Sequence, residues 1–486
     1  MGLLPKGLFT DLVAFAARRP ERFPDQIAGL FTAMRDGGVV AFKDVRRFNG
    51  GLFTVIDPLP LTAAELTDLA TAAGLDWGAV EPAIFGTLFE RSLDPAKRAQ
   101  LGAHYTGRDD IARVVEPVVM TPLRRRWAEV RVEADRLKTA WDAAATPQTR
   151  RNRRDAFAAL LFTFQEELAA VRILDPACGS GNFLYVALTA LKDLEKEVVA
   201  YGTASGLPAM LPLVHPQQLH GLEINPVAHE LAQVVVWIGY LQWMRSNGFQ
   251  VTRDPVLEPL ETIRLQDALL DRSDPAHPKE APWTEADFII GNPPFLGGKR
   301  LRAELGDETV DKLFAVYGCR VAREADLVAY FFEKARAEID AGRVRRAGLL
   351  ATNSIRGGAN RHVLDRIKES GDIFLAWDDE PWILNGAAVR ISIVGFDAGE
   401  EQERSLNGLP VTAINANLTA ATDITAAKPL RENQGIAFMG DTKGGPFDVP
   451  GQLARCWLSL PTNPNGHPNR DVVRPWVNGL DVTRRP

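Results

Sequence analysis

The amino-acid sequence predicts an α/β fold, in which a seven-stranded, doubly wound sheet follows an N-terminal helical region. From residue 171 onward, short apolar runs end in Gly, Pro or Asp and alternate with longer helical stretches, which is typical of strand–helix–strand units. Before residue 171, apolar residues recur at three- and four-residue spacing, as in amphipathic helices. The expected strands are 171–174, 219–222, 263–265, 288–290, 347–351, 373–377 and 390–396.

The chain is long enough for several structural units. With 486 residues it exceeds what one ordinary core needs. Residues 1–100 are expected to form a helical spacer, in which Thr62-Ala-Ala-Glu65 is a capping box. Residues 101–400 are expected to form the domain that carries the chemistry, with a helical insert at about residues 120–168. Asn, Gly, Pro and Thr become frequent in residues 401–486, which are expected to begin a further region.

Composition and charge restrict where the protein is expected to act and what it is expected to bind. The content of 46% hydrophobic and 24% charged residues is ordinary for globular proteins, and no run reaches the roughly 18 apolar residues of a membrane span. The N-terminus lacks a secretion signal and the three cysteines lie far apart, so we expect a cytoplasmic protein without a bound metal. The net charge of −6 argues against a uniformly basic, nucleic-acid-binding surface. One basic stretch lies at residues 124–154, where a solvated helical hairpin is the simpler interpretation.

The segment Asp175–Phe183 connects the first strand to a helix and predicts a cofactor loop. Glycines at 179 and 181 allow the backbone to approach a ligand closely. The carboxylate of Asp175 would repel a phosphate but suits an ammonium group. The third glycine of the dinucleotide fingerprint is also missing, because position 184 is Leu. The loop therefore favours a methionine-bearing cofactor over a dinucleotide.

Acidic residues at the ends of the next two strands predict further cofactor contacts. Glu223 follows the second strand, where a carboxylate accepts hydrogen bonds from both ribose hydroxyls. An inserted loop at residues 201–216 explains its long separation from Asp175. Ile224 would then cover one face of an adenine ring. Asp267, after the third strand, is a candidate acceptor for the adenine amine, with a helix cap as the alternative.

The fourth strand ends in Asn292-Pro293-Pro294-Phe295, which predicts a catalytic loop. Prolines cannot continue a central strand, and they would hold this loop rigid where open α/β sheets bind ligands. A ring amine is a poor nucleophile because its lone pair is delocalised into the ring. If the Asn292 side-chain oxygen and the Pro293 carbonyl accept hydrogen bonds from such an amine, its lone pair is directed toward a methyl group. Phe295 offers a flat face on which an extruded base can stack.

The order of these motifs resembles the gamma-class N6-adenine DNA methyltransferases. In that family a cofactor-binding segment precedes the Gly loop, and Gly102-Ala-His104-Tyr105-Thr106 resembles that segment, although Tyr105 and Thr106 could also cap a helix. Segments 326–332 and 348–355 resemble the helix and the fifth strand of the same fold. The resemblance implies S-adenosylmethionine as cofactor, bound by Tyr105, Thr106, Asp175, Ala177, Gly179, Gly181, Asn182, Phe183, Glu223, Ile224 and Asp267.

Segments 84–90, 292–299 and 473–479 more narrowly resemble large single-chain, type IIL-like enzymes of restriction-modification and phage defence. This resemblance implies double-stranded DNA with a flipped adenine as substrate, and a specificity or defence-complex subunit as a candidate partner. Before residue 104 no Asp or Glu is followed two positions later by Lys, so the nuclease metal site of such enzymes is absent and cleavage is not expected. The chain ends where target recognition would begin, so residues 401–486 are expected to be an incomplete start of that region.

The sequence excludes one related class of methyltransferase and leaves three alternative functions. A cytosine-C5 methyltransferase needs a Pro-Cys nucleophile, and the sequence contains no Pro-Cys dipeptide. RNA and protein-glutamine N-methyltransferases also use Asn-Pro-Pro-aromatic and remain the alternative enzymes. A DNA-binding subunit of a defence complex that keeps the fold without turnover is the alternative that is not an enzyme.

Overall fold

The computed structural model of the chain describes residues 4–47, 55–75, 80–84, 106–249, 260–274, 277–384, 387–421, 430–433 and 447–476, with a few positions between these ranges. The chain divides into two compact units, Met1–Asp423 and Ile424–Pro486. The candidate site lies entirely in the first unit.

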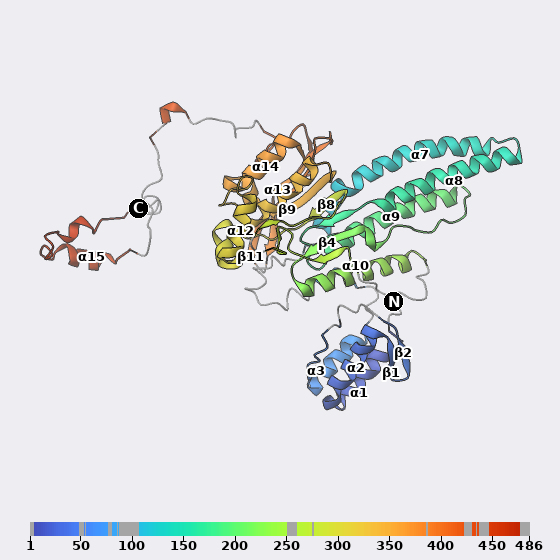
Figure 1. The fold of residues 1–486 in the computed structure, drawn as a ribbon, viewed down its shortest axis with the longest axis horizontal. Helices are drawn as coiled ribbons and strands as arrows, with labels where there is room; N and C mark the ends of the chain where they lie inside the picture. Colours follow the sequence, from blue (N-terminus) through green and yellow to red (C-terminus); the bar gives the residue numbers. More distant parts are fainter. Residues whose placement is uncertain are drawn as a thin grey trace. The chain divides into compact units, whose positions relative to one another are not determined.

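The centre of the first unit is a nine-stranded sheet with the order β13-β12-β10-β11-β9-β8-β3-β4-β5 (Figure 1). Its strands are β3 (Ile173–Asp175), β4 (Leu219–Glu223), β5 (Ile263–Leu265), β8 (Phe288–Gly291), β9 (Arg346–Thr352), β10 (Asp372–Leu384), β11 (Ala387–Asp397), β12 (Arg404–Leu406) and β13 (Leu409–Val411). Strands β5, β4, β3, β8 and β9 run parallel, and β11 is antiparallel to both β9 and β10.

All seven predicted strands are present and form one sheet, which confirms the predicted fold class. The short pair β12 and β13 was not predicted. It extends the sheet to residue 411, whereas the sequence placed the end of this domain near residue 400. Two smaller antiparallel pairs lie outside the sheet: β1 (Gly38–Val40) with β2 (Lys43–Val45), and β6 (Leu270–Asp271) with β7 (Lys279–Glu280).

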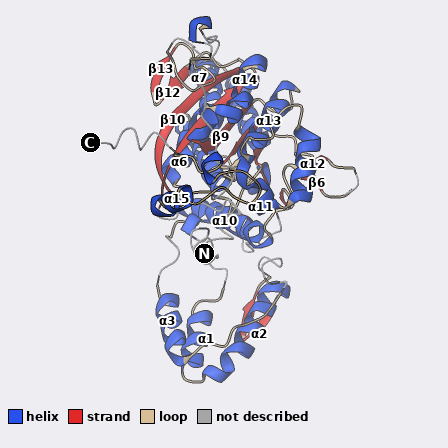
Figure 2. Cartoon of the chain, turned by 90° about the vertical axis from the view of Figure 1, so that its left-hand side faces the viewer, coloured by secondary structure: helices blue, strands red, loops and turns tan. Residues whose placement is uncertain are grey.

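Successive residues of the central strands point to opposite faces of the sheet and bury two separate cores. Ile173 and Ile290 belong to one hydrophobic cluster, and their neighbours Leu174 and Ile289 to the other. The first cluster is covered by α6 (Arg108–Val115), α7 (Thr121–Asp142), α8 (Pro147–Ala170), α9 (Asn182–Ala204) and α10 (Pro226–Ser246). The second is covered by α11 (Leu301–Leu305), α12 (Asp307–Tyr317), α13 (Leu327–Asp340) and α14 (Gly358–Ser370). Figure 2 shows α13 and α14 on the same side of β9 and β10.

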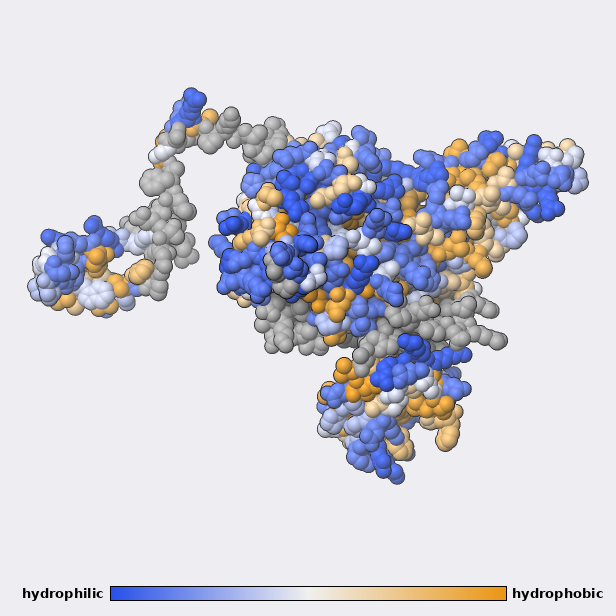
Figure 3. Space-filling model, in the orientation of Figure 1, coloured by the Kyte–Doolittle hydropathy of each residue, from blue (hydrophilic) through white to orange (hydrophobic). Residues whose placement is uncertain are grey.

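The expected helical insert is the hairpin of α7 and α8, whose two helices pack along each other (Figure 1). A π-helical turn at Glu116–Met120 joins α6 to α7. The tip of the hairpin is mostly hydrophilic (Figure 3). Most basic side chains of residues 124–154 are neutralised by acids: ion pairs join Arg124 to Glu116 and Glu197, Arg125 to Glu401 and Glu403, Arg126 to Glu129 and Glu167, Arg136 to Glu133, Lys138 to Asp142, and Arg151 and Arg154 to Asp155. This pairing favours the interpretation of a solvated hairpin.

The N-terminal residues form a small helical core of their own. Helices α1 (Leu8–Ala17), α2 (Phe23–Asp36) and α3 (Ala63–Ala73) bury Leu8, Ile27 and Leu66 in one cluster. The predicted capping box is confirmed, because the Thr62 side chain accepts from the Glu65 backbone N–H and the Glu65 carboxylate accepts from the Thr62 N–H. In the second unit, the described residues include helix α15 (Gly451–Leu458). None of the helices among the described residues has the length and apolar character to cross a membrane.

Candidate active site

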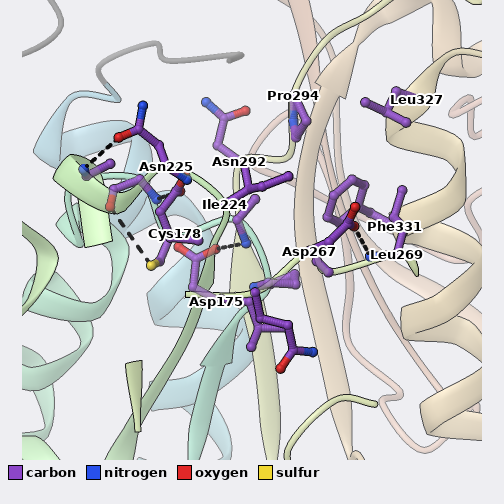
Figure 4. Close-up of a pocket in the computed structure, with 18 of the residues that line it drawn as sticks. Asp175, Cys178, Ile224, Asn225, Asp267, Leu269, Asn292, Pro294, Leu327 and Phe331 are labelled. Carbon is purple, nitrogen blue, oxygen red and sulfur yellow. Dashed lines mark hydrogen bonds between the residues drawn. The ribbon is translucent and has the colours of Figure 1, made fainter. Parts of the chain in front are cut away.

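A cavity of about 360 Å³ opens at the carboxyl ends of the central strands. Asp175 is the last residue of β3, Glu223 is the last residue of β4, and Asn292 directly follows β8. All three line the cavity, and Figure 4 shows Asp175 and Asn292 on neighbouring strands beside Ile224. The carboxyl edge of a parallel sheet is where open α/β folds bind ligands, so the topology brings these three predicted residues together.

The Gly loop turns sharply between β3 and α9. Gly179 and Gly181 both have left-handed backbone conformations, with φ angles of 52° and 84°. A Cβ atom on Gly181 would lie 3.0 Å from the Cα of Ala232 in α10, whereas a Cβ on Gly179 would meet nothing within 4 Å. Gly181 therefore lets two helices approach closely, and Gly179 leaves open space beside the cavity. Ala177, Asn182 and Phe183, which were predicted with this loop, also line the cavity.

Asp175 is buried beneath this loop. One of its carboxylate oxygens accepts a hydrogen bond from the Ala177 backbone N–H at 3.0 Å. Burial raises the pKa of Asp175 to about 8, because removal from water penalises the charged form more than this hydrogen bond stabilises it, and the nearby Glu223 carboxylate adds repulsion. Gly291 leaves room for this carboxyl, since a Cβ there would lie 2.5 Å from the Asp175 Oδ1. A cation bound in the cavity would lower the pKa of Asp175 and favour its ionised form.

The carboxylate of Glu223 connects the Gly loop to the following helix. Its Oε2 accepts from the Gly179 backbone N–H at 2.9 Å, and its Oε1 accepts from the Asn225 N–H at 2.7 Å. Burial raises the pKa of Glu223, and these backbone hydrogen bonds partly oppose that shift. Ile224, which is half exposed, also lines the cavity (Figure 4).

Asp267 lines the cavity, but its carboxylate already has three partners. Oδ1 accepts from the backbone N–H groups of Leu269 and Leu270 at 2.9 and 3.1 Å, and Oδ2 accepts from the Arg272 guanidinium at 2.8 Å. The side chain thus closes a tight turn after β5, and no helix begins at this point. The alternative of a helix cap is wrong, because the carboxylate binds the backbone N–H groups of this turn and not those of a helix.

Asn292 has a fixed amide orientation. Its Nδ2 donates to the hydroxyl of Thr106 at 3.0 Å, and Thr106 is buried in the cavity wall. The remaining oxygen, Oδ1, is buried and has no hydrogen-bond partner among the described residues. An unsatisfied buried acceptor is costly, and it marks a position where a ligand is expected to donate. Pro294 lines the same cavity.

The structure does not place every predicted site residue in the cavity. Phe295 does not line the cavity and instead packs, half-buried, against the first hydrophobic core. Tyr105 and residues 102–104 lie outside the described residues, as do parts of the motifs at 84–90 and 473–479. Their predicted roles stay predictions.

Sequence reasoning missed the apolar wall of the cavity. It is built from Leu269 and Leu270 after β5, from Thr309 and Leu313 of α12, and from Leu327 and Phe331 of α13. Figure 4 shows Phe331 beside Asp267 and Leu269. These side chains belong to ordinary amphipathic patterns, so their spacing carries no signal that separates a cavity wall from core. Within the described ranges, no group of His, Cys, Asp and Glu side chains could hold a metal ion.

The parallel centre of the sheet and the cavity at its carboxyl edge define an α/β fold with a ligand site at the ends of its central strands. The chain belongs to the family of the MmeI DNA-methyltransferase domain, whose sequence model matches residues 146–407. The type IIL restriction-modification enzyme MmeI, solved in complex with DNA, superposes with a TM-score of 0.65 at 24% identity, covering 87% of this chain and 56% of that one.

Two curated proteins are similar in sequence. DNA methyltransferase A of Bacillus subtilis strain 168 is 26% identical over 388 residues, which are 77% of this chain and 40% of that protein. A putative type II restriction enzyme and methyltransferase of Methanocaldococcus jannaschii is 25% identical over 237 residues, which are 41% of this chain and 19% of that protein. The chain therefore spans less than half the length of these relatives.

Proposed function

We propose that this chain transfers the methyl group of S-adenosylmethionine to the exocyclic N6 amine of adenine in DNA, as the modification activity of a restriction-modification or phage-defence system. The observation that carries the proposal is the buried Oδ1 of Asn292, which has no hydrogen-bond partner among the described residues and is held after β8 in the same cavity as the Gly loop. An acceptor in this position suits a substrate that presents an N–H group and needs activation as a nucleophile. The family of the DNA-methyltransferase domain supports DNA as the acceptor.

The residues of the cavity fit S-adenosylmethionine. Asp175 suits its ammonium group, as does the buried Oδ1 of Asn182, which has no hydrogen-bond partner among the described residues, and Glu223 suits its ribose hydroxyls. The apolar wall that includes Leu269 and Phe331 suits its adenine ring. When bound, this cofactor supplies an electrophilic methyl group on a sulfonium. The other predicted contacts, Ile224, Asp267 and Tyr105, are part of the same proposal.

The catalytic loop activates and orients the amine. The Thr106 hydroxyl fixes the Asn292 amide by accepting from Nδ2, which leaves Oδ1 as the acceptor for the substrate amine. Hydrogen bonds from the amine to this oxygen and to the Pro293 carbonyl stabilise the positive charge that develops on nitrogen during transfer. The adenine must leave the duplex to reach Asn292. Phe295, which is half-buried and does not line the cavity in this structure, is the proposed stacking surface for it through its remaining exposed face. These roles assign catalysis to Asn292, Pro293, Pro294 and Phe295.

Methyl transfer from labelled S-adenosylmethionine identifies the class of acceptor. The full chain is incubated in parallel with unmethylated DNA, with RNA and with cell protein, and the label in each fraction is counted. We expect label in DNA only. Label in RNA or on protein glutamine would replace the proposal by one of the alternative enzymes, and an absence of label in all three would support a subunit without turnover.

Cofactor binding is expected to release close to one proton at pH 7. The pKa of Asp175 is about 8 in the cofactor-free chain, so its carboxyl is mainly protonated at pH 7, and a cationic ligand favours the ionised form. Titration calorimetry in two buffers with different ionisation enthalpies measures the release. Asp175→Asn, which cannot ionise, is the control and should release none. Proton uptake by the wild-type chain would contradict the pairing of Asp175 with the ammonium group.

The isolated chain is expected to bind DNA weakly. Its net charge is −6, and the basic side chains of the α7–α8 hairpin are largely engaged with acids. Phosphate contacts without base contacts give non-specific dissociation constants of about 10⁻⁴–10⁻⁶ M at physiological salt. Binding assays on random and mixed-sequence duplexes test this expectation. Tight, sequence-selective binding would show that the chain itself contains a working recognition module, whereas weak binding leaves sequence selection to a partner.

A further inference from the structure

Two of the sequence motifs, segments 326–332 and 348–355, make no hydrogen bond to the Gly loop or to the Glu223 side chain among the described residues. They meet at the carboxyl edge of the sheet, beside the catalytic loop. Asp326 directly precedes α13, and Ser354 lies in the short helical turn that follows β9. Asp326 occupies the N-cap position, yet its side chain makes no capping hydrogen bond to α13. An Asp at an N-cap usually caps its own helix, so this carboxylate serves another purpose.

The carboxylate of Asp326 connects three segments that are far apart in the sequence. Its Oδ1 accepts from the backbone N–H of Gly298 at 3.0 Å. Its Oδ2 accepts from the Ser354 hydroxyl at 2.8 Å and from the Asn360 side-chain amide at 2.7 Å. Asn360 in turn accepts from the Asp326 backbone N–H at 2.6 Å, and it is itself buried. We name these four residues, Gly298, Asp326, Ser354 and Asn360, the Asp326 junction.

The junction acts on the segment that directly follows the catalytic loop. The backbone N–H of Leu327 donates to the carbonyl of Leu296 at 2.8 Å, which adds a second connection between this segment and the start of α13. Gly298 approaches the same region so closely that a Cβ atom there would lie 2.3 Å from the carbonyl oxygen of Glu324. At the other end of the loop, Asn292 is held by Thr106. The loop is therefore fixed on both sides of Asn292-Pro293-Pro294-Phe295.

We propose that Asp326 is a positioning residue for methyl transfer, which holds the catalytic loop at the distance from the cofactor that reaction requires. This inference rests on the proposed function. Asp326 does not line the cavity, so it touches neither cofactor nor base and acts through the position of Asn292. Misplacement of a reacting group by about 1 Å costs about 100-fold in rate, which is why such a loop needs support from outside the site. The same contact explains why segments 326–332 and 348–355 accompany the catalytic motif.

Asp326→Asn tests the inference with the smallest change of shape. The carboxylate accepts three hydrogen bonds, and an amide has one acceptor oxygen and two donors, so at least one of the junction contacts is lost. The kcat for methyl transfer to DNA is expected to fall about 10- to 100-fold, while the dissociation constant of S-adenosylmethionine changes by less than about twofold. Asp340→Asn, at the exposed other end of α13, is the matched control and should leave both unchanged.

A double variant separates positioning from general stability. If Asp326 acts only through the catalytic loop, Asp326→Asn should lower the residual kcat of the Asn292→Ala protein by less than about twofold. A purely structural residue would instead lower the thermal midpoint and cofactor affinity together and leave the kcat of the folded fraction unchanged. Wild-type kcat in a folded Asp326→Asn protein would overturn the positioning role of Asp326 and would leave the proposed function unaffected. No methyl transfer to DNA by the wild-type chain would overturn the proposed function and this inference with it.

Asn360→Ala provides a second test if Asp326→Asn does not fold. It removes one contact to Oδ2 and the acceptor of the Asp326 N–H, while the bond from Gly298 is kept. Its kcat should fall about 3- to 10-fold with cofactor affinity retained, because the carboxylate is then less well oriented. An unchanged kcat in this variant would also contradict the role of the junction.

Discussion

Asn292→Ala is expected to cut the turnover of methyl transfer at least about 100-fold and to leave the affinity for S-adenosylmethionine near that of the wild-type chain. The hydrogen bond from the target amine to Oδ1 strengthens as positive charge develops on nitrogen, so its loss affects the transition state more than the bound ground state. The structure supports a specific loss, because Oδ1 has no partner among the described residues and only Nδ2 is engaged, with Thr106. Single-turnover rates and cofactor titrations on the same preparation separate the two quantities.

Two further variants accompany Asn292→Ala: one tests the orientation of the amide, and the other is a control. Thr106→Val keeps the size of the side chain but removes the acceptor for Nδ2, so the amide can rotate and turnover should fall by less than in Asn292→Ala. Asn152→Ala, on the exposed face of α8, should have no effect. Wild-type turnover in a folded Asn292→Ala protein would refute the catalytic role of the loop.

Glu223→Ala is expected to weaken S-adenosylmethionine binding by about 2–3 kcal/mol, which is roughly a 30- to 150-fold increase in the dissociation constant. In the proposed site the carboxylate accepts from both ribose hydroxyls, and in the structure it also holds the Gly loop by accepting from the Gly179 N–H. Loss of both contacts should act on cofactor affinity, with little effect on turnover at saturating cofactor. Titration calorimetry measures the affinity.

The control for this measurement is Glu261→Ala, an exposed acid just before β5, which should bind cofactor normally. The thermal midpoint of Glu223→Ala reports whether the Gly loop itself is destabilised. Unchanged cofactor affinity in a folded Glu223→Ala protein would remove Glu223 from the site and weaken the assignment of the whole cofactor loop.

The sequence could predict the sheet and the polar residues at its edge, because both follow from local patterns. Each strand is a short apolar run closed by a turn residue, and parallel strands place Asp175, Glu223 and Asn292 at one edge whatever the details of packing. The pair β12 and β13 was not predicted because Arg404-Ser405-Leu406 and Leu409-Pro410-Val411 contain no continuous apolar run, and a proline disfavours a strand. They are defined mainly by pairing with β10, which is a tertiary contact.

The remaining differences arise where side chains compete for partners. Asp267 stays a predicted cofactor contact, and its oxygens also bind two backbone N–H groups and Arg272, a competition that no motif reveals. Phe295 was predicted to offer a free face, but the adjoining core takes up part of its surface. Phe331 and Leu313 could not be predicted as cavity residues, since the period of an amphipathic helix shows which face is buried but not what it is buried against.

The product nucleoside tests the central claim most directly. DNA methylated by the full chain is digested to nucleosides, and the methylated species are separated and identified by mass. If Asn292 activates an exocyclic adenine amine, the product is N6-methyl-2′-deoxyadenosine, and its amount falls at least about 100-fold in the Asn292→Ala protein. A methylated cytosine as the product, or N6-methyl-2′-deoxyadenosine in equal amount from Asn292→Ala, would contradict the account.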